Sequence, residues 1–168
     1  MSNSAKLNFI EQQGFTSLSG PACELQYTAL MFQPRLLGGF VLVALIFQSW
    51  VLFLTLSAIL WWNVSVPVLN PFDAVYNKFI AGPKGLQLLT PAPKPRRFAQ
   101  GMAATFMLCI GPFLFFKLQT LAWIFESFLV VALSFLIFGK FCLGSYVFHL
   151  IKGKVAFANR TLPWVRNN

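Results

Sequence analysis

The amino-acid sequence predicts an all-α integral membrane protein, with four transmembrane helices in two hairpins and a cytoplasmic linker that contains an amphipathic helix. Two observations predict this class. Hydrophobic residues make up 57% of the 168 residues and charged residues only 10%, whereas a soluble domain carries about a quarter charged residues. The hydrophobic residues are also concentrated in two long blocks, and the basic residues lie mostly outside them.

The first hydrophobic block covers residues 36–62. As one helix it would be about 40 Å long, which exceeds the hydrocarbon core of roughly 30 Å. Gln48 and Ser49 interrupt the block at its middle, so we expect a tight turn there between two helices. The first helix then begins upstream, near Tyr27 or Met31, and the Arg35 side chain reaches the membrane surface.

The second block covers residues 98–151 and divides near residues 117–120. The third span is expected at 98–116 and the fourth at about 120–141, with a continuation past His149 as an alternative.

The positive charges favour four spans over three. The formal net charge of +9 comes from 13 Lys and Arg against 4 Asp and Glu. With four spans the two turns hold only Lys117, and nearly every other positive charge lies on one side of the membrane. Three spans would carry the basic linker across the membrane, against the positive-inside rule. We therefore expect an integral membrane protein with both termini in the cytoplasm, and the membrane explains the charge without a nucleic-acid partner.

The linker has a helix signal of its own. Asn70-Pro71-Phe72-Asp73 combines an N-cap residue, a proline at the first helical position and an acid in the first turn. Apolar residues follow on one face at helical spacing, and Gly82-Pro83 ends the pattern. The helix is expected either to lie on the membrane surface or to pack against the cytoplasmic end of the bundle.

The chain therefore divides into five expected segments. They are an N-terminal cytoplasmic or interfacial segment (1–30), a first transmembrane hairpin (31–66), a cytoplasmic linker (67–97), a second transmembrane hairpin (98–151) and a basic cytoplasmic tail (152–168).

The sequence contains no recognisable catalytic motif or metal-binding pattern, so we expect a non-catalytic protein. The single histidine, His149, and the three cysteines form no cluster with metal-ligand spacing. No phosphate loop or nucleotide fingerprint is present, and the sequence indicates no cofactor. His149 is a candidate ligand for haem or a pigment, with an ordinary place near the membrane interface as the alternative.

Cys142 and Cys23 are the candidate redox thiols. Cys142 lies at the basic end of the fourth span, where Lys140 could favour the thiolate, and it is expected to be more accessible from the cytoplasm than the mid-span Cys109. The alternative is a small buried residue that packs beside Gly139 and Gly144. Glu126 is the only acid within a hydrophobic block, which makes it either a functional group or a side chain that reaches the interface.

Candidate contacts with other subunits fall into two groups. Small residues at Gly38, Gly39 and Gly101 permit close helix approach within a membrane. The apolar face of the linker helix offers an interfacial contact through Phe72, Val75, Tyr76 and Phe79.

Several short stretches in a fixed order also carry a family resemblance, over about residues 23–149. They are Cys23 before the first span, Arg35 at its start, Asn70-Pro71-Phe72 after the second, Pro95-Arg96-Arg97-Phe98-Ala99 at the third, and Phe141-Cys142 after the fourth. Through them the chain resembles the bacterial membrane proteins of domain-of-unknown-function family 4395. The resemblance implies a four-helix membrane protein and no particular activity.

One position departs from the pattern of that family. Its members typically show Phe-Cys-x-x-Cys, whereas this chain has Ser145 in place of the second cysteine. A Cys-x-x-Ser site cannot close an internal disulfide, so it would form mixed disulfides or use a different second thiol.

Two functions follow as hypotheses. The first is an accessory or structural subunit that docks on a larger membrane assembly, with the bilayer and other membrane proteins as partners. The second is a membrane partner in thiol or sulfur redox chemistry, using Cys142 and Cys23.

Overall fold

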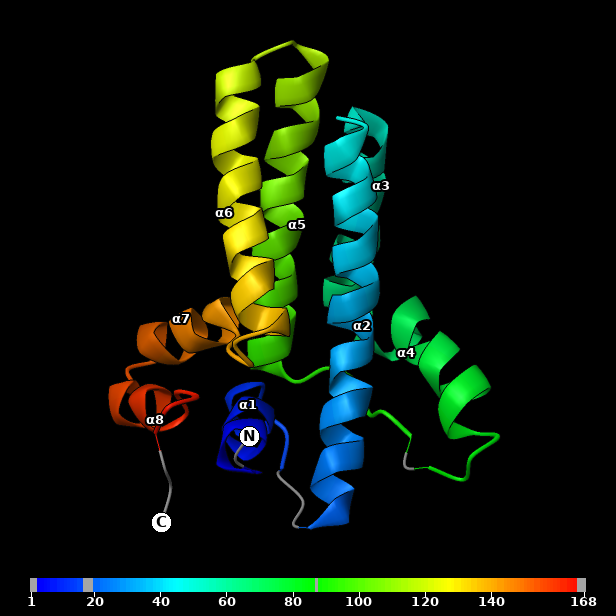
Figure 1. Cartoon of the computed structure of the whole chain (residues 1–168), viewed down its shortest axis with the longest axis vertical. Coiled ribbons are helices and arrows are strands. Elements are labelled where there is room, and N and C mark those ends of the chain that lie inside the picture. The colour runs from blue at the N-terminus through cyan, green and yellow to red at the C-terminus, as the bar shows by residue number, and fades with distance from the viewer. Residues whose placement is uncertain (1–2, 17–19, 87, 166–168) are drawn as a thin grey trace.

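The computed structural model describes residues 3–16, 20–86 and 88–165, and these residues form α-helices joined by short turns, with no β-strand among them. Four helices stand side by side as the upper part of the molecule in Figure 1. They are α2 (Pro21–Ile46), α3 (Trp50–Ser65), α5 (Lys94–Phe115) and α6 (Gln119–Ile137). The helical class predicted from the sequence is therefore confirmed.

Three of these helices, covering Ala22–Ile46, Lys94–Phe115 and Gln119–Ile137, are long and apolar enough to cross a membrane. The fourth, α3, is apolar but has 16 residues. At about 1.5 Å per residue it spans roughly 24 Å, which is less than the hydrocarbon thickness.

The two predicted turns are confirmed. Ser49 caps α3, because its hydroxyl accepts a hydrogen bond from the backbone N–H of Leu52. Gln48 and Lys117 take positive φ values of 45° and 58° in the turns that follow α2 and α5, the left-handed conformation that often ends a helix.

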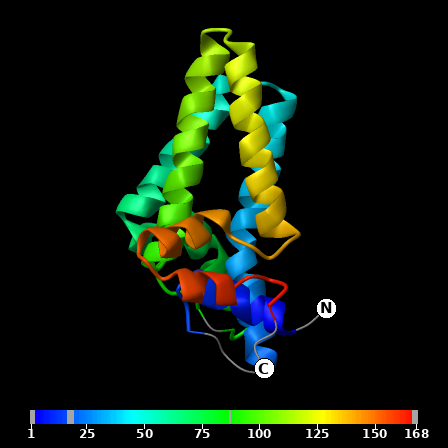
Figure 2. The ribbon, with the colours of Figure 1, turned by 90° about the vertical axis from the view of Figure 1, so that its left-hand side faces the viewer.

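The fourth hydrophobic helix ends at Ile137, earlier than the predicted Phe141, and it does not continue past His149. The chain breaks because Lys140 adopts a φ of 53° and the backbone N–H of Phe141 turns back to bond Phe135 O at 3.1 Å. A new helix, α7 (Leu143–Ile151), then crosses the foot of α5, as Figure 2 shows.

The third hydrophobic helix begins at Lys94 rather than Phe98. Pro95 lies in the first turn of this helix. Backbone N–H groups in the first turn have no acceptor within the helix, so a proline there costs no hydrogen bond.

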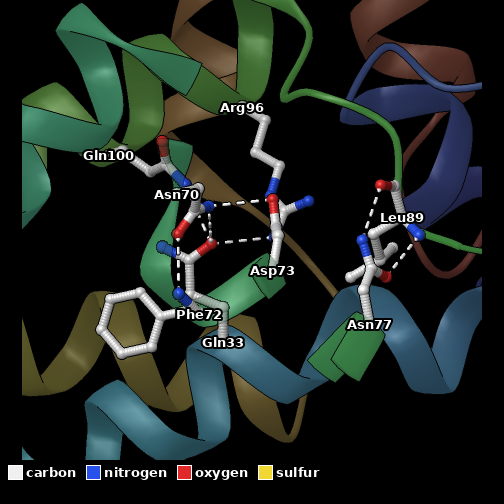
Figure 3. Close-up of polar contacts among 8 residues, drawn as sticks. All are labelled: Gln33, Asn70, Phe72, Asp73, Asn77, Leu89, Arg96 and Gln100. Atoms are coloured by element: carbon white, nitrogen blue, oxygen red, sulfur yellow. Dashed lines mark hydrogen bonds and ion pairs between the residues drawn. The ribbon is translucent and has the colours of Figure 1, made fainter. Parts of the chain in front are cut away.

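Shorter helices gather at one end of the bundle, the lower end in Figures 1 and 2. They are α1 (Asn3–Gln12), α4 (Pro71–Tyr76), its π-helical extension η2 (Asn77–Ala81), α7 and α8 (Val155–Arg160). A helix begins where the linker sequence predicts one, with Asn70 accepting a hydrogen bond from the backbone N–H of Phe72 at 3.0 Å. The linker then closes on itself, because the Asn77 side chain bonds both backbone groups of Leu89 (Figure 3).

Three apolar clusters hold these layers together, and two of them are large. The larger of these two fills the upper bundle and includes Val41, Phe53, Leu60, Met107 and Ile110. The smaller of the two joins α1 to the foot of α2 and reaches the start of α7; its buried members are Phe9, Ile10, Cys23, Tyr27, Leu30, Met31 and Cys142.

Candidate functional site

A cluster of polar side chains is buried where α2, α4 and α5 meet, and Figure 3 shows it in close-up. We call it the polar cluster; each member is at most 8% exposed, and the members are Gln33, Asn70, Asp73, Arg96 and Gln100. Burial of so many polar groups is costly unless they bond one another.

Gln33 is the centre of the polar cluster. Its Oε1 atom accepts hydrogen bonds from Arg96 Nη2 at 2.8 Å and from Gln100 Nε2 at 3.0 Å. Asn70 Nδ2 lies 3.4 Å from the same oxygen and 2.9 Å from Asp73 Oδ2. The network therefore ties the linker helix to two helices of the upper bundle.

Asp73 and Arg96 form the ion pair of this cluster, with Arg96 Nη2 at 3.4 Å from Asp73 Oδ1. Burial raises the pKa of Asp73 above its usual value, and the guanidinium of Arg96 and the bond from Asn70 partly offset that rise. The charge of Arg96 is thus balanced within the chain.

A cavity of about 180 Å³ adjoins the polar cluster between α2, α5 and α6. We call it the inner pocket. Its polar lining comes from Gln13, Gln33, Arg96, Gln100 and Cys142, and its remaining lining is almost wholly apolar. Leu37, Ala103, Phe106, Leu129 and Ala132 are among the apolar side chains.

Three polar atoms at the inner pocket are buried without a hydrogen-bond partner in the described structure. They are Arg96 Nη1, Gln100 Oε1 and Gln13 Oε1. Such groups are rare because each one costs free energy. Residues that line a mainly apolar cavity thus carry one donor and two acceptors without a hydrogen-bond partner, and such polar groups beside an apolar space suit an amphiphile with an oxygen-bearing head group.

Cys142 stands at the N-cap of α7 and lines the same pocket. Ser145 donates its hydroxyl to Cys142 Sγ at 3.3 Å, and the backbone N–H of Cys142 bonds Gln12 Oε1 at 2.9 Å. Burial raises the pKa of Cys142; the bonds from Ser145 and Gly144 and the charge of Arg96 only partly oppose this. The thiol form therefore predominates at neutral pH.

One expectation about Cys142 is corrected, and its burial is a separate finding. The cation that favours its thiolate is Arg96 and not Lys140, whose ammonium lies over the Tyr27 ring at 5.5 Å. Cys142 is also buried, whereas Cys109 is partly exposed. Cys142 is buried because α1 covers the start of α7, and sequence spacing did not reveal that cover.

The other candidate residues lie elsewhere. Cys23 is buried in the cluster that also contains Cys142. Glu126 is buried, with both carboxylate oxygens 3.3 Å from Gln48 Nε2 of the α2–α3 turn. His149 is buried against Phe157 and places Nε2 3.0 Å from the backbone oxygen of Gln12. Among the described residues no group of three or more His, Cys, Asp or Glu could hold a metal ion.

The apolar face of the linker helix is divided. Phe72 and Tyr76 are buried, whereas Val75 and Phe79 are exposed, so the helix packs on the bundle with one side and presents the other.

The three glycines proposed as contacts with other subunits also differ in their surroundings. A Cβ atom on Gly38 would lie 2.9 Å from Ile137 Cδ1, so this glycine serves the contact of α2 with α6 inside the chain. Gly39 has open space around it, and Gly101 faces Val64 of α3.

Sequence reasoning missed the polar cluster. Arg96 and Asn70 belong to the stretches that carry the family resemblance. The sequence indicates only that Arg96 is a positive charge that orients the protein in the membrane and that Asn70 is a helix cap. Gln33 and Gln100 give no signal of their own, since isolated glutamines beside a hydrophobic block are ordinary. Asp73 and Arg96 each lie in the first turn of a helix expected at the same side of the membrane. That placement could have suggested the ion pair between them.

A comparison with protein families matches residues 28–152 to the domain of unknown function DUF4395. No curated protein and no solved structure matches. The match covers more than half of the chain and includes α3, α4, α5, α6 and α7 entire, with most of α2. The chain therefore belongs to the DUF4395 family.

Proposed function

We propose that this protein is a small non-catalytic membrane subunit that holds an amphiphile in its inner pocket. The observation that carries the proposal is that Arg96, Gln100 and Gln13 line an apolar cavity and each has a buried polar atom without a hydrogen-bond partner, Nη1 in the case of Arg96. A ligand oxygen that accepts from Nη1 would remove the free-energy cost of burying that donor.

The pocket indicates the class of head group. Asp73 already balances the charge of Arg96, so a neutral head fits better than an anion. It would carry a carbonyl or hydroxyl oxygen for Arg96 and a hydroxyl or amine hydrogen for Gln100 or Gln13. The apolar remainder would lie against Phe106, Leu129 and their neighbours.

An accessory role in a larger assembly is the second part of the proposal. The outer face of α6 presents bulky apolar residues at helical spacing, with Ile124, Phe128, Val131 and Phe135 all exposed. A surface of this kind suits a protein neighbour as well as lipid. The exposed Phe79 of the linker helix adds an interfacial contact.

We further propose four spans in a bacterial inner membrane, with both termini and the linker in the cytoplasm. The short α3 runs antiparallel to α2. The shorter helices α1, α4, α7 and α8 all lie at one end of the bundle (Figure 1). The basic residues of that end support its cytoplasmic placement.

Thiol chemistry is the alternative function. Its specific support is the place of Cys142 at the N-cap of a nine-residue helix, bonded by Ser145 and lining the pocket. Burial and a raised pKa make the thiol less nucleophilic, and for that reason we rank this function second.

The ligand proposal is tested by extraction of the full-length protein from its own membranes in a mild detergent, followed by mass spectrometry of co-purified small molecules. Ala132 lines the inner pocket, and its neighbour Val131 faces outward. Ala132→Phe should lower the amount of bound amphiphile by about tenfold, because the larger ring fills the cavity, and Val131→Phe should leave it unchanged. Equal recovery from both variants, or no ligand in the unmodified protein, would refute the proposal.

The accessory role is tested by native electrophoresis of the same extract. A complex with additional polypeptides is expected. A species at the mass of a monomer or dimer, with no other chain attached, would count against this role.

A further inference from the structure

A second recess, larger than the inner pocket, opens on the other side of α5, and we call it the outer groove. It has a volume of about 680 Å³ and is lined by residues of α3, α5, α6 and the end of α7. Met102 and Phe106 line both spaces, so these side chains form the wall between them.

The groove is basic at one end. Lys94 and Arg97 come from the first turn of α5, and Lys152 follows α7, which packs across the foot of α5 (Figure 2). No acidic residue lines the groove among the described residues.

The acids of the chain are committed elsewhere. Glu11 pairs with Arg160, Glu24 with Lys6 and Asp73 with Arg96, while Glu126 bonds Gln48. These are the 4 acidic residues of the sequence. No acidic side chain of the chain is therefore left to balance Lys94, Arg97 and Lys152, and an external anion could do so.

Arg97 is positioned for such an anion. Its Nε donates to the backbone oxygen of Val64 at 2.9 Å, and Nη2 donates to the same oxygen. Val64 lies in the last turn of α3, where carbonyl oxygens lack a partner within the helix. The bond fixes the guanidinium at the groove and leaves further N–H donors for a ligand.

The rest of the groove is apolar and runs along α5. Arg97, Gly101 and Thr105 recur every four residues, so they form one stripe about 12 Å long. Gly101 adds no side chain to this floor. Two aromatic pairs flank it, Phe98 with Phe148 at 5.6 Å and Phe106 with Phe125 at 5.5 Å between ring centroids.

We infer that the outer groove binds an anionic phospholipid. Its phosphate would lie among Lys94, Arg97 and Lys152, and one acyl chain would run over Gly101 and Thr105 between the aromatic pairs. Cationic sites at the foot of membrane helices bind such head groups. A free phosphate could use only the basic end, whereas a lipid matches both the charge and the long apolar floor. This inference is independent of the inner pocket and its ligand.

The test is native mass spectrometry of the full-length protein in detergent, with phosphatidylglycerol or phosphatidylcholine of identical acyl chains added at equal concentration. Phosphatidylglycerol should bind more tightly. Lys152→Gln should weaken its binding by about fivefold, the effect of one lysine near an anionic lipid, whereas Lys154→Gln, two residues away and outside the groove, should not.

The acyl chain is tested separately with Gly101→Leu, which fills the floor, against Gly39→Leu, whose Cβ meets nothing within 4 Å. Only Gly101→Leu should reduce lipid binding, while the ligand of the inner pocket is retained. Inorganic phosphate at millimolar concentration should not displace the lipid. Equal binding of both lipids, equal effects of Lys152→Gln and Lys154→Gln, no effect of Gly101→Leu, or displacement by phosphate would each overturn the inference.

Discussion

Arg96 at the start of α5 and Asp73 in α4 face each other across the junction between the linker helix and the bundle, with Nη2 and Oδ1 3.4 Å apart and both residues buried. The pair joins segments 23 positions apart in sequence. Because both side chains are mostly buried, each depends on the other for charge balance, and Arg96 also depends on its bond to Gln33.

Removal of one partner should therefore destabilise the protein strongly. Asp73→Asn is expected to cost about 3–5 kcal/mol, because it leaves the Arg96 charge buried without a counterion. Thermal unfolding in detergent, followed by size-exclusion chromatography, measures the loss. Glu24→Gln is the control: this acid pairs with Lys6 and its side chain is 55% exposed, so its removal should cost at most about 1 kcal/mol. Equal effects of the two substitutions would contradict the assigned role of the buried pair.

Gly144 should tolerate no side chain. A Cβ atom there would lie 2.6 Å from the Cα and 2.7 Å from the Cβ of Ala99, so α7 would have to move away from α5. We expect Gly144→Ala to lower stability by about 1–3 kcal/mol, as overpacking does, and to increase labelling of Cys142. Gly39→Ala, at an open position, should do neither. Thermal unfolding and the labelling rate of Cys142 test this prediction. If Gly144→Ala changed neither quantity, the contact between α7 and α5 would be looser than described.

Cys142 should react slowly in the folded protein. Its pKa is raised above the ordinary value of 9.0 by burial, so the thiolate fraction at any pH below that value is smaller than for a free cysteine. A variant with Cys142 as its single cysteine should be alkylated more slowly when folded than when unfolded in sodium dodecyl sulfate, from pH 7 to pH 9. The rate should rise as the pH increases. Faster alkylation of the folded form at pH 7 would indicate a lowered pKa and would favour the redox function.

Reporter fusions test the proposed topology. Fusions at Ala81 and at the C-terminus should report a cytoplasmic location, and a fusion at Ser49 in the α2–α3 turn should report the opposite side, because the basic residues gather at one end of the bundle. A translocated Ala81 reporter in otherwise intact protein would refute four spans.

The helical class, the two turns and the start of the linker helix follow from the sequence. Hydrophobic blocks longer than one bilayer must break, and local signals are strong enough to place the breaks. The Ser49 hydroxyl caps α3 by accepting a hydrogen bond from the backbone N–H of Leu52, and Asn70 caps the linker helix through the backbone N–H of Phe72. These features depend on contacts between residues that are close in sequence, so they can be predicted from the sequence.

The tertiary structure alone decided the candidate sites. Gln33, Asp73 and Arg96 meet from three helices, and Lys152 reaches the groove of α5 only because the chain turns sharply after Ile137. Burial of Cys142 likewise depends on the packing of α1 across the start of α7. Contacts of this kind join residues that are distant in sequence, and their free energies depend on burial and geometry, which no local pattern encodes.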